Sequence, residues 1–210
     1  MSIEQETLQP QKAAKPPRGV LRRFRRDRKG TASIEFAILA LPFFIVIFAS
    51  IETFLAFYGD QLLANATETL ARKIRTGEIT FNRGKPATDM DEVKFRQAFC
   101  NEISVLMTCS ATEAAQASKL YIDVRSVTDL TKFPVLVPRM DTSSSSDLKT
   151  AELKFAPGGP GSFNVMRAYY RWSVTTDLIR PFVTNLRPAG SSMPKDYLMV
   201  STTTFRTENE

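Results

Sequence analysis

Residues 31–60 read TASIEFAILALPFFIVIFASIETFLAFYGD and follow directly on the basic run RRFRRDRKG of residues 22–30. No charged residue occurs from 36 to 51, where Glu52 interrupts the apolar stretch. As an α-helix, residues 32–57 would span about 39 Å at ~1.5 Å per residue, which exceeds the ~30 Å hydrocarbon core of a bilayer. The stretch therefore predicts a transmembrane helix.

The basic residues before this helix account for the charge of the whole chain. Residues 18–29 carry a net charge of +6, equal to that of all 210 residues. An excess of Lys and Arg on one flank follows the positive-inside rule, so we expect the N-terminus in the cytoplasm and the C-terminal part across the membrane. Because no basic surface is evident elsewhere, we expect no nucleic-acid partner. The flank that determines this topology consists of Arg22, Arg23, Arg25, Arg26, Arg28 and Lys29.

Two residues inside the helix are unusual for a membrane segment. Pro42 removes a backbone donor and crowds the preceding turn, so we expect a kink or local unwinding there. Glu52 lies about 26 Å of helix beyond Glu35, so it should meet water or a partner helix near the opposite membrane interface.

The apolar pattern continues at helical spacing beyond residue 60, and Gly77 is a suitable stop. We therefore expect one helix of about 45 residues, nearly 70 Å long. Three regions are predicted: a disordered basic cytoplasmic leader (1–30), a transmembrane helix with an amphipathic extension (31–77), and a periplasmic α+β domain (78–210).

The predicted domain contains a second helix and a short antiparallel sheet. Thr88 or Asp89 is expected to cap the helix, which ends near Cys109. Alternation of apolar and polar residues predicts a strand at 120–127. Two further strands are expected near 165–176 and 197–205, and the serines at 143–146 are expected in a solvated loop. On the second strand, Tyr170 and Trp172 should share one face, and Tyr169 and Arg171 the other.

Cysteine and histidine usage limits the chemistry of the exported part. Cys100 and Cys109 are the two cysteines, and their proximity in sequence predicts a disulfide, with two buried free thiols as the alternative. Closing this loop would stabilise the fold by roughly 2.7 kcal/mol in the chain-entropy model. The chain has no histidine, which excludes Ser-His-Asp and Cys-His systems and removes a common zinc ligand. We therefore expect no enzyme, catalytic residue, cofactor, metal or small-molecule substrate.

The boundary between the basic run and the helix carries the most specific motif. Gly30 is followed five residues later by Glu35, after which the apolar helix continues. This arrangement resembles a class III signal peptide, as in type IV pilins, which a prepilin peptidase cuts after the glycine. The resemblance implies a processing site formed by Gly30, Thr31, Glu35 and Phe36. In an uncleaved anchor, Glu35 would instead be an acid favoured by the helix dipole.

The resemblance extends to a named family. The run RRDRKGTASIEFAILALPFF, with IET and LA further on, is similar to the N-terminal signature of the TadE-like family, the minor pilins or pseudopilins of the tight-adherence (Flp, type IVb) pilus system. The later blocks FRQAFCNEIS, KLYIDVRSV, RAYYRWSV and TTTFRTE resemble the C-terminal domain of the same family. Two departures from the major Flp pilins, Phe36 in place of tyrosine and the long exported part, point to a minor pilin.

The resemblance implies a function in assembly of the adhesive Flp pilus. The expected location is the bacterial inner membrane, single-pass, with the C-terminal domain in the periplasm. The expected partners are the membrane, a prepilin peptidase, other Tad pilins or pseudopilins, and inner-membrane pilus assembly proteins. In this interpretation Glu35, Pro42 and Glu52 belong to the assembly helix. The alternative is an uncleaved, membrane-anchored periplasmic scaffold or adhesin.

Overall fold

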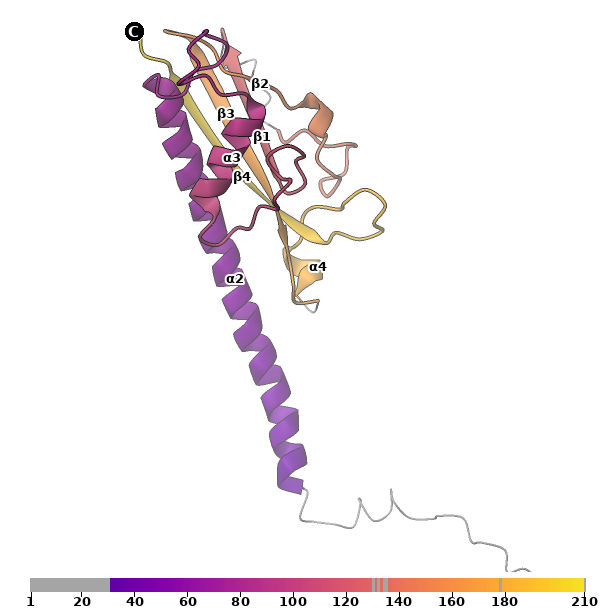
Figure 1. Ribbon diagram of the computed structural model, residues 1–210. Helices are drawn as coiled ribbons and strands as arrows, with labels where there is room; N and C mark the ends of the chain where they lie inside the picture. Colours follow the sequence, from indigo (N-terminus) through magenta and orange to yellow (C-terminus); the bar gives the residue numbers. More distant parts are fainter. Residues whose placement is uncertain (1–30, 130, 132, 134–135, 178, 210) are drawn as a thin grey trace, which may run out of the picture. The chain divides into compact units, whose positions relative to one another are not determined.

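A computed structural model describes residues 31–129, 131, 133, 136–177 and 179–209 (Figure 1). The described residues fall into two units, which divide between Ile47 and Phe48. The predicted leader (1–30) lies outside the described residues. The elements in chain order are α2 (Thr31–Arg75), α3 (Glu92–Ile103), β1 (Leu120–Val127), η3 (Thr150–Glu152), β2 (Phe155–Ala156), β3 (Phe163–Ser173), α4 (Arg180–Val183) and β4 (Asp196–Arg206).

The α+β class predicted from the sequence is confirmed, and the sheet is mixed. Its strand order is β2-β1-β3-β4, with β1 and β4 both antiparallel to β3. The additional strand β2 pairs in parallel with β1, where Val124 is opposite Phe155. A strand of two residues is too short to show an alternating pattern, so sequence periodicity did not predict it.

The predicted strand bounds are close to those observed. The first strand, 120–127, coincides with β1, and the third extends by one residue at each end in β4. The second begins earlier than expected and ends at Ser173 rather than residue 176. The reason for the earlier end is that the backbone N–H groups of Thr175 and Thr176 donate to a side chain of α2 instead of a strand.

The main core joins α2 and α3 to one face of the sheet. Leu63, Leu70 and Ile74 of α2 are buried, as are Phe95 and Phe99 of α3. The sheet contributes alternate residues of each strand because successive side chains point to opposite faces. These are Leu120, Ile122 and Val124 of β1, Met166, Ala168 and Tyr170 of β3, and Met199 of β4.

A second, smaller cluster covers the opposite face of the sheet. Tyr169 and Leu198 of the sheet pack against Leu148 and Leu186, which come from the long connections before β3 and β4. As predicted, Tyr169 lies on the face opposite Tyr170, and Trp172 packs against the main core. The prediction of a solvated loop at 143–146 is wrong at Ser146, which is buried and accepts a hydrogen bond from the Asp141 N–H.

Helix α3 begins later than the sequence predicted. Its N-cap is Asp91, whose carboxylate accepts from the Lys94 N–H at 2.8 Å. Asp89, one of the expected caps, instead accepts from the Thr80 hydroxyl and from the N–H groups of Arg83 and Lys85. Both are acidic residues before an apolar helix, so spacing alone could not separate a cap from a residue that orders the preceding loop.

The end of α3 is tied to the following segment by the predicted disulfide. The structure joins Cys100 to Cys109, with their Cα atoms 5.9 Å apart. No described cysteine is free. The bridge therefore constrains the turn that leads from α3 toward β1.

A buried carboxylate organises the start of β1. Glu113 is 1% exposed and accepts from the Ser118 hydroxyl and the backbone N–H groups of Ser118, Lys119 and Leu120. Burial by itself would raise the pKa of Glu113, but these four donors together lower it below the ordinary value of 4.5. The ionised form of Glu113 therefore stabilises the folded chain.

We expect Glu113→Gln to lower the free energy of unfolding by about 1–3 kcal/mol at neutral pH, because the donors lose a charged acceptor. The folded-state pKa is depressed, so this contribution is present above the ordinary value of 4.5 and is lost as pH falls through the folded-state pKa. The difference in the free energy of unfolding between the wild type and Glu113→Gln should therefore become smaller as the pH falls. Chemical unfolding in detergent as a function of pH measures it.

The matched control for this prediction is Glu78→Gln, which changes an exposed glutamate. Its effect on stability should stay within about 0.5 kcal/mol at every pH. If Glu113→Gln is as stable as the control at neutral pH, the ionised Glu113 carboxylate does not stabilise the fold.

Candidate functional site

The first part of α2 is an uncovered apolar helix. No described residue from 32 to 57 is buried, and Phe36 and Leu39 are each 71% exposed. Large apolar side chains occur on every side of the helix, which is typical of a segment surrounded by lipid or by other helices. Within the described residues, this is the one helix long and apolar enough to cross a membrane.

Glu35 lies within this apolar surface. Glu35 is exposed, and none of the described residues forms an ion pair with its carboxylate. Phe36, the next residue of the predicted processing site, is equally exposed. The backbone of Thr31 forms the first residue of α2, whereas Gly30 and the basic flank lie outside the described residues. The structure therefore places the described part of the predicted site at the start of one apolar helix.

Of the kink or local unwinding expected at Pro42, the unwinding is not found, and the kink stays a prediction. The helix continues without interruption from Thr31 to Arg75, with Pro42 inside it. Proline lacks one N–H, so the Ile38 carbonyl four residues earlier loses its intrahelical donor, while the neighbouring turns keep theirs. The consequence is one backbone acceptor on an otherwise apolar surface.

Glu52 is half-buried and has hydrogen-bond partners within the chain. Its carboxylate accepts from the backbone N–H of Thr175 at 2.6 Å and of Thr176 at 3.1 Å. The chain therefore supplies partners that the sequence did not predict, and contact of Glu52 with water or a partner helix stays a prediction. A carboxylate that accepts two backbone N–H groups connects α2 to the segment after β3 and positions the sheet on the helix.

A second polar contact, two helical turns further along α2, joins that helix to strand β4. The Tyr197 hydroxyl at the start of β4 donates to Asp60 of α2 at 3.1 Å. Burial, and after it the Asp60 carboxylate, raises the pKa of Tyr197 above its ordinary value of 10.0. Tyr197 therefore remains a neutral donor across the physiological range.

An apolar cavity of about 300 Å³ lies between these two contacts. Glu52 and Asp60 contribute its polar edge. Its walls include Ala56 and Phe57 of α2, Trp172 and Val174 at the end of β3, and Ile179 and Val183 at α4. The lining has the character of a hydrophobic contact surface, with no nucleophile paired to a base.

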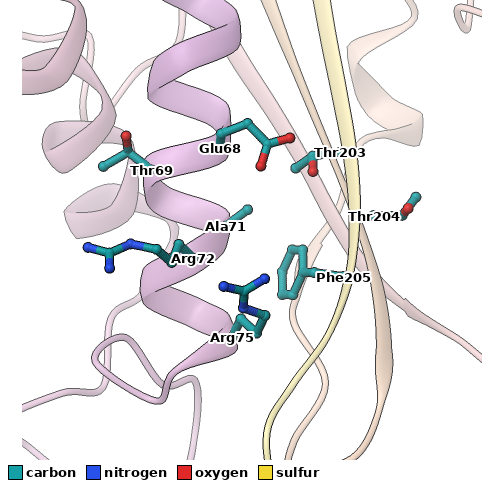
Figure 2. Close-up of a pocket in the computed structure, with 8 residues that line it drawn as sticks. All are labelled: Glu68, Thr69, Ala71, Arg72, Arg75, Thr203, Thr204 and Phe205. Atoms are coloured by element: carbon teal, nitrogen blue, oxygen red, sulfur yellow. The ribbon is translucent and has the colours of Figure 1, made fainter.

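A second cavity, of about 250 Å³, lies near the end of α2 beside β4 (Figure 2). In this view the Glu68 side chain extends toward Thr203 and the Arg75 guanidinium lies beside Phe205, whereas Thr69 and Arg72 point away from the strand. The cavity is polar and carries both charge signs. Throughout the described part of the chain, no group of three or more Cys, Asp or Glu side chains is arranged to hold a metal ion.

The comparisons with known proteins bear on the helix. Residues 30–72 match the model of the TadE-like protein family. The match confirms the resemblance predicted from the sequence, and it includes Gly30, Glu35, Phe36, Pro42 and Glu52. The sheet lies outside it, so the similarity of the later blocks to that family remains a prediction. Neither the curated proteins nor the solved structures gave a match.

Sequence reasoning missed the partners of Glu52 and Asp60. An isolated acid in a long apolar stretch was a signal that a polar partner exists. The partners of Glu52 are backbone N–H groups more than 120 residues later, and a backbone donor has no sequence signature. The partner of Asp60 is a single tyrosine among five, and only the sheet register selects it.

We expect Glu52→Ala to leave α2 intact and to release the segment after β3. Loss of the acceptor leaves two N–H groups unpaired, so amide hydrogen exchange at Thr175 and Thr176 should accelerate roughly tenfold or more, the ratio that corresponds to about 1.4 kcal/mol. Exchange measured by mass spectrometry on the full chain in detergent tests this. Thr53→Ala is the control, because Thr53 donates only to the Ala49 carbonyl of its own helix. Equal exchange in the two variants would remove the role assigned to Glu52.

Proposed function

We propose that this protein is a pilin-like subunit of the Tad (Flp) system that acts in pilus assembly through its TadE-like helix. The observation that carries the proposal is the match over residues 30–72 to a helix whose apolar side chains are uncovered on all sides. Such a surface serves an insertion and packing function, and it needs no catalytic group. We accordingly propose a protein that is no enzyme and needs no cofactor.

The proposed topology is a single-pass protein of the bacterial inner membrane. The basic residues from Arg22 to Lys29 remain in the cytoplasm because of the positive-inside rule. About 20 residues of helix after Ala32 are sufficient to cross the hydrocarbon core. The sheet then lies in the periplasm, an oxidising compartment that is compatible with the Cys100–Cys109 disulfide.

In this proposal a prepilin peptidase cuts after Gly30, and Thr31 becomes the new N-terminus with a positively charged amine. Glu35 then lies about 6 Å further along the helix. Because no described residue forms an ion pair with Glu35, its carboxylate is available for the amine of a neighbouring subunit. Such a pair lowers the cost of an ionised group among apolar helices and sets the register between subunits.

The N-terminus of the protein extracted from membranes tests the cleavage step. With the cognate prepilin peptidase present, we expect intact mass and terminal peptide mapping to give a chain that begins at Thr31. Without the peptidase, or with Gly30→Leu, the basic leader should remain. If the leader remains in every case, the protein is the alternative uncleaved scaffold, and the processing proposal fails.

Glu35→Ala tests the assembly step separately. We expect this variant to insert into the membrane at the normal level and to reduce piliation strongly, because the register-setting charge is lost. Pilus yield on cells and protein level in the membrane fraction are the two measurements. The matched control is Glu68→Ala, an acidic residue on the same helix beyond the span, which should leave piliation unchanged. Normal piliation with Glu35→Ala would overturn the assembly role.

A further inference from the structure

The segment after β3 carries an apolar group that nothing covers within the described part of the chain. Phe182 in α4 is 87% exposed, whereas its neighbours Ile179 and Val183 turn toward α2 and line the apolar cavity. We call residues 174–177 and 179–183 the docking segment. We propose that this segment binds the surface of the lipid bilayer, with Phe182 inserted among the headgroups and the upper acyl chains. The inference rests on the proposed membrane span and is independent of cleavage after Gly30.

The hydrogen bonds to Glu52 place the docking segment at a defined residue of the helix. The charge-free run ends at Glu52, and residues 32–51 form the 20 residues, about 30 Å of helix, that cross the hydrocarbon core. Thr175 and Thr176 donate to Glu52, so the docking segment lies beside the residue at which the helix leaves the hydrocarbon. A segment at this depth meets the headgroup layer.

The side chains of the docking segment suit an interface between lipid and water. Phe182 supplies an apolar anchor for the interfacial region. Arg180 is held in place by an ion pair with Asp177 at 2.7 Å and by a hydrogen bond to the Val174 carbonyl at 3.1 Å. The segment is therefore ordered around the exposed ring before it meets a membrane.

The apolar surface of the span continues beside this segment, which favours lipid over a protein partner. Phe54, Phe57 and Tyr58 of α2 remain exposed beyond Glu52, and Phe57 lines the same cavity as Ile179 and Val183. Trp172 and Tyr197 line that cavity as well, and both residue types are enriched at membrane interfaces. Phe182 adds a further exposed apolar ring close to this surface.

Tryptophan quenching by brominated lipid tests the proposal on the full chain. The protein has one tryptophan, so Trp172→Phe provides a silent background in which single tryptophans are introduced. The probe is Phe182→Trp, reconstituted at low density in phosphatidylethanolamine–phosphatidylglycerol vesicles with or without bromine near the headgroup end of the acyl chains. We expect bromine to reduce its emission by roughly half or more. If the background does not fold, the variants are made with Trp172 retained, and its signal is subtracted.

Two further positions make the result specific. Phe163→Trp lies at the opposite end of β3, about 33 Å from Ser173 at ~3.3 Å per residue, and bromine should leave its emission unchanged. Phe43→Trp reports the span and should be quenched by bromine placed deep in the acyl chain. An unquenched Phe182→Trp beside a quenched Phe43→Trp overturns the docking proposal alone. Loss of quenching at both positions overturns the span as well. Quenching at Phe182→Trp that disappears as protein density rises would assign the surface to a second copy of the chain and overturn lipid docking.

Discussion

One helix has to satisfy two environments, and the rest of the structure depends on this constraint. In the first part of α2 no residue is buried and the apolar side chains point in all directions, whereas from Leu63 onward the buried side chains form one stripe. A helix that is apolar all round is stable in lipid or in a bundle, and a striped helix is stable against a folded domain. Both patterns occur in one uninterrupted helix, α2.

Polar contacts define where one environment changes to the other. Glu52 accepts two backbone N–H groups and Asp60 accepts the Tyr197 hydroxyl, with an apolar cavity between them. Hydrophobic packing alone would allow the sheet to slide along an apolar helix, because it has no preferred direction. Hydrogen bonds to carboxylates are directional and give a definite register. The two acids therefore hold the sheet at one position along α2.

The interior of the domain uses the same combination of packing and satisfied polar groups. Phe95 and Phe99 of α3 fill the space over β1, while the disulfide and the Glu113 carboxylate order the connection between these elements. On the other face, Tyr169 and Leu198 are covered by residues from long irregular connections. Those connections are polar in composition, which is why the burial of Ser146 could not be expected from its serine-rich surroundings.

The amino-acid sequence by itself determined the helix, its apolar character, the three long strands, the disulfide and the family resemblance. These features depend on neighbours in the chain: a charge-free run, alternation along β1, and two cysteines nine residues apart. Only the tertiary structure decided the parallel strand β2, the cap at Asp91, and the partners of Glu52 and Asp60. Strand β2, the cap at Asp91 and the partners of Glu52 depend on which backbone groups meet in the fold, and a backbone donor is the same for every residue except proline. The partner of Asp60 depends on the sheet, which brings the Tyr197 hydroxyl to α2. The exposure of Phe182 belongs to this second group, because only the fold shows that its ring is uncovered while Ile179 and Val183 line the cavity beside α2.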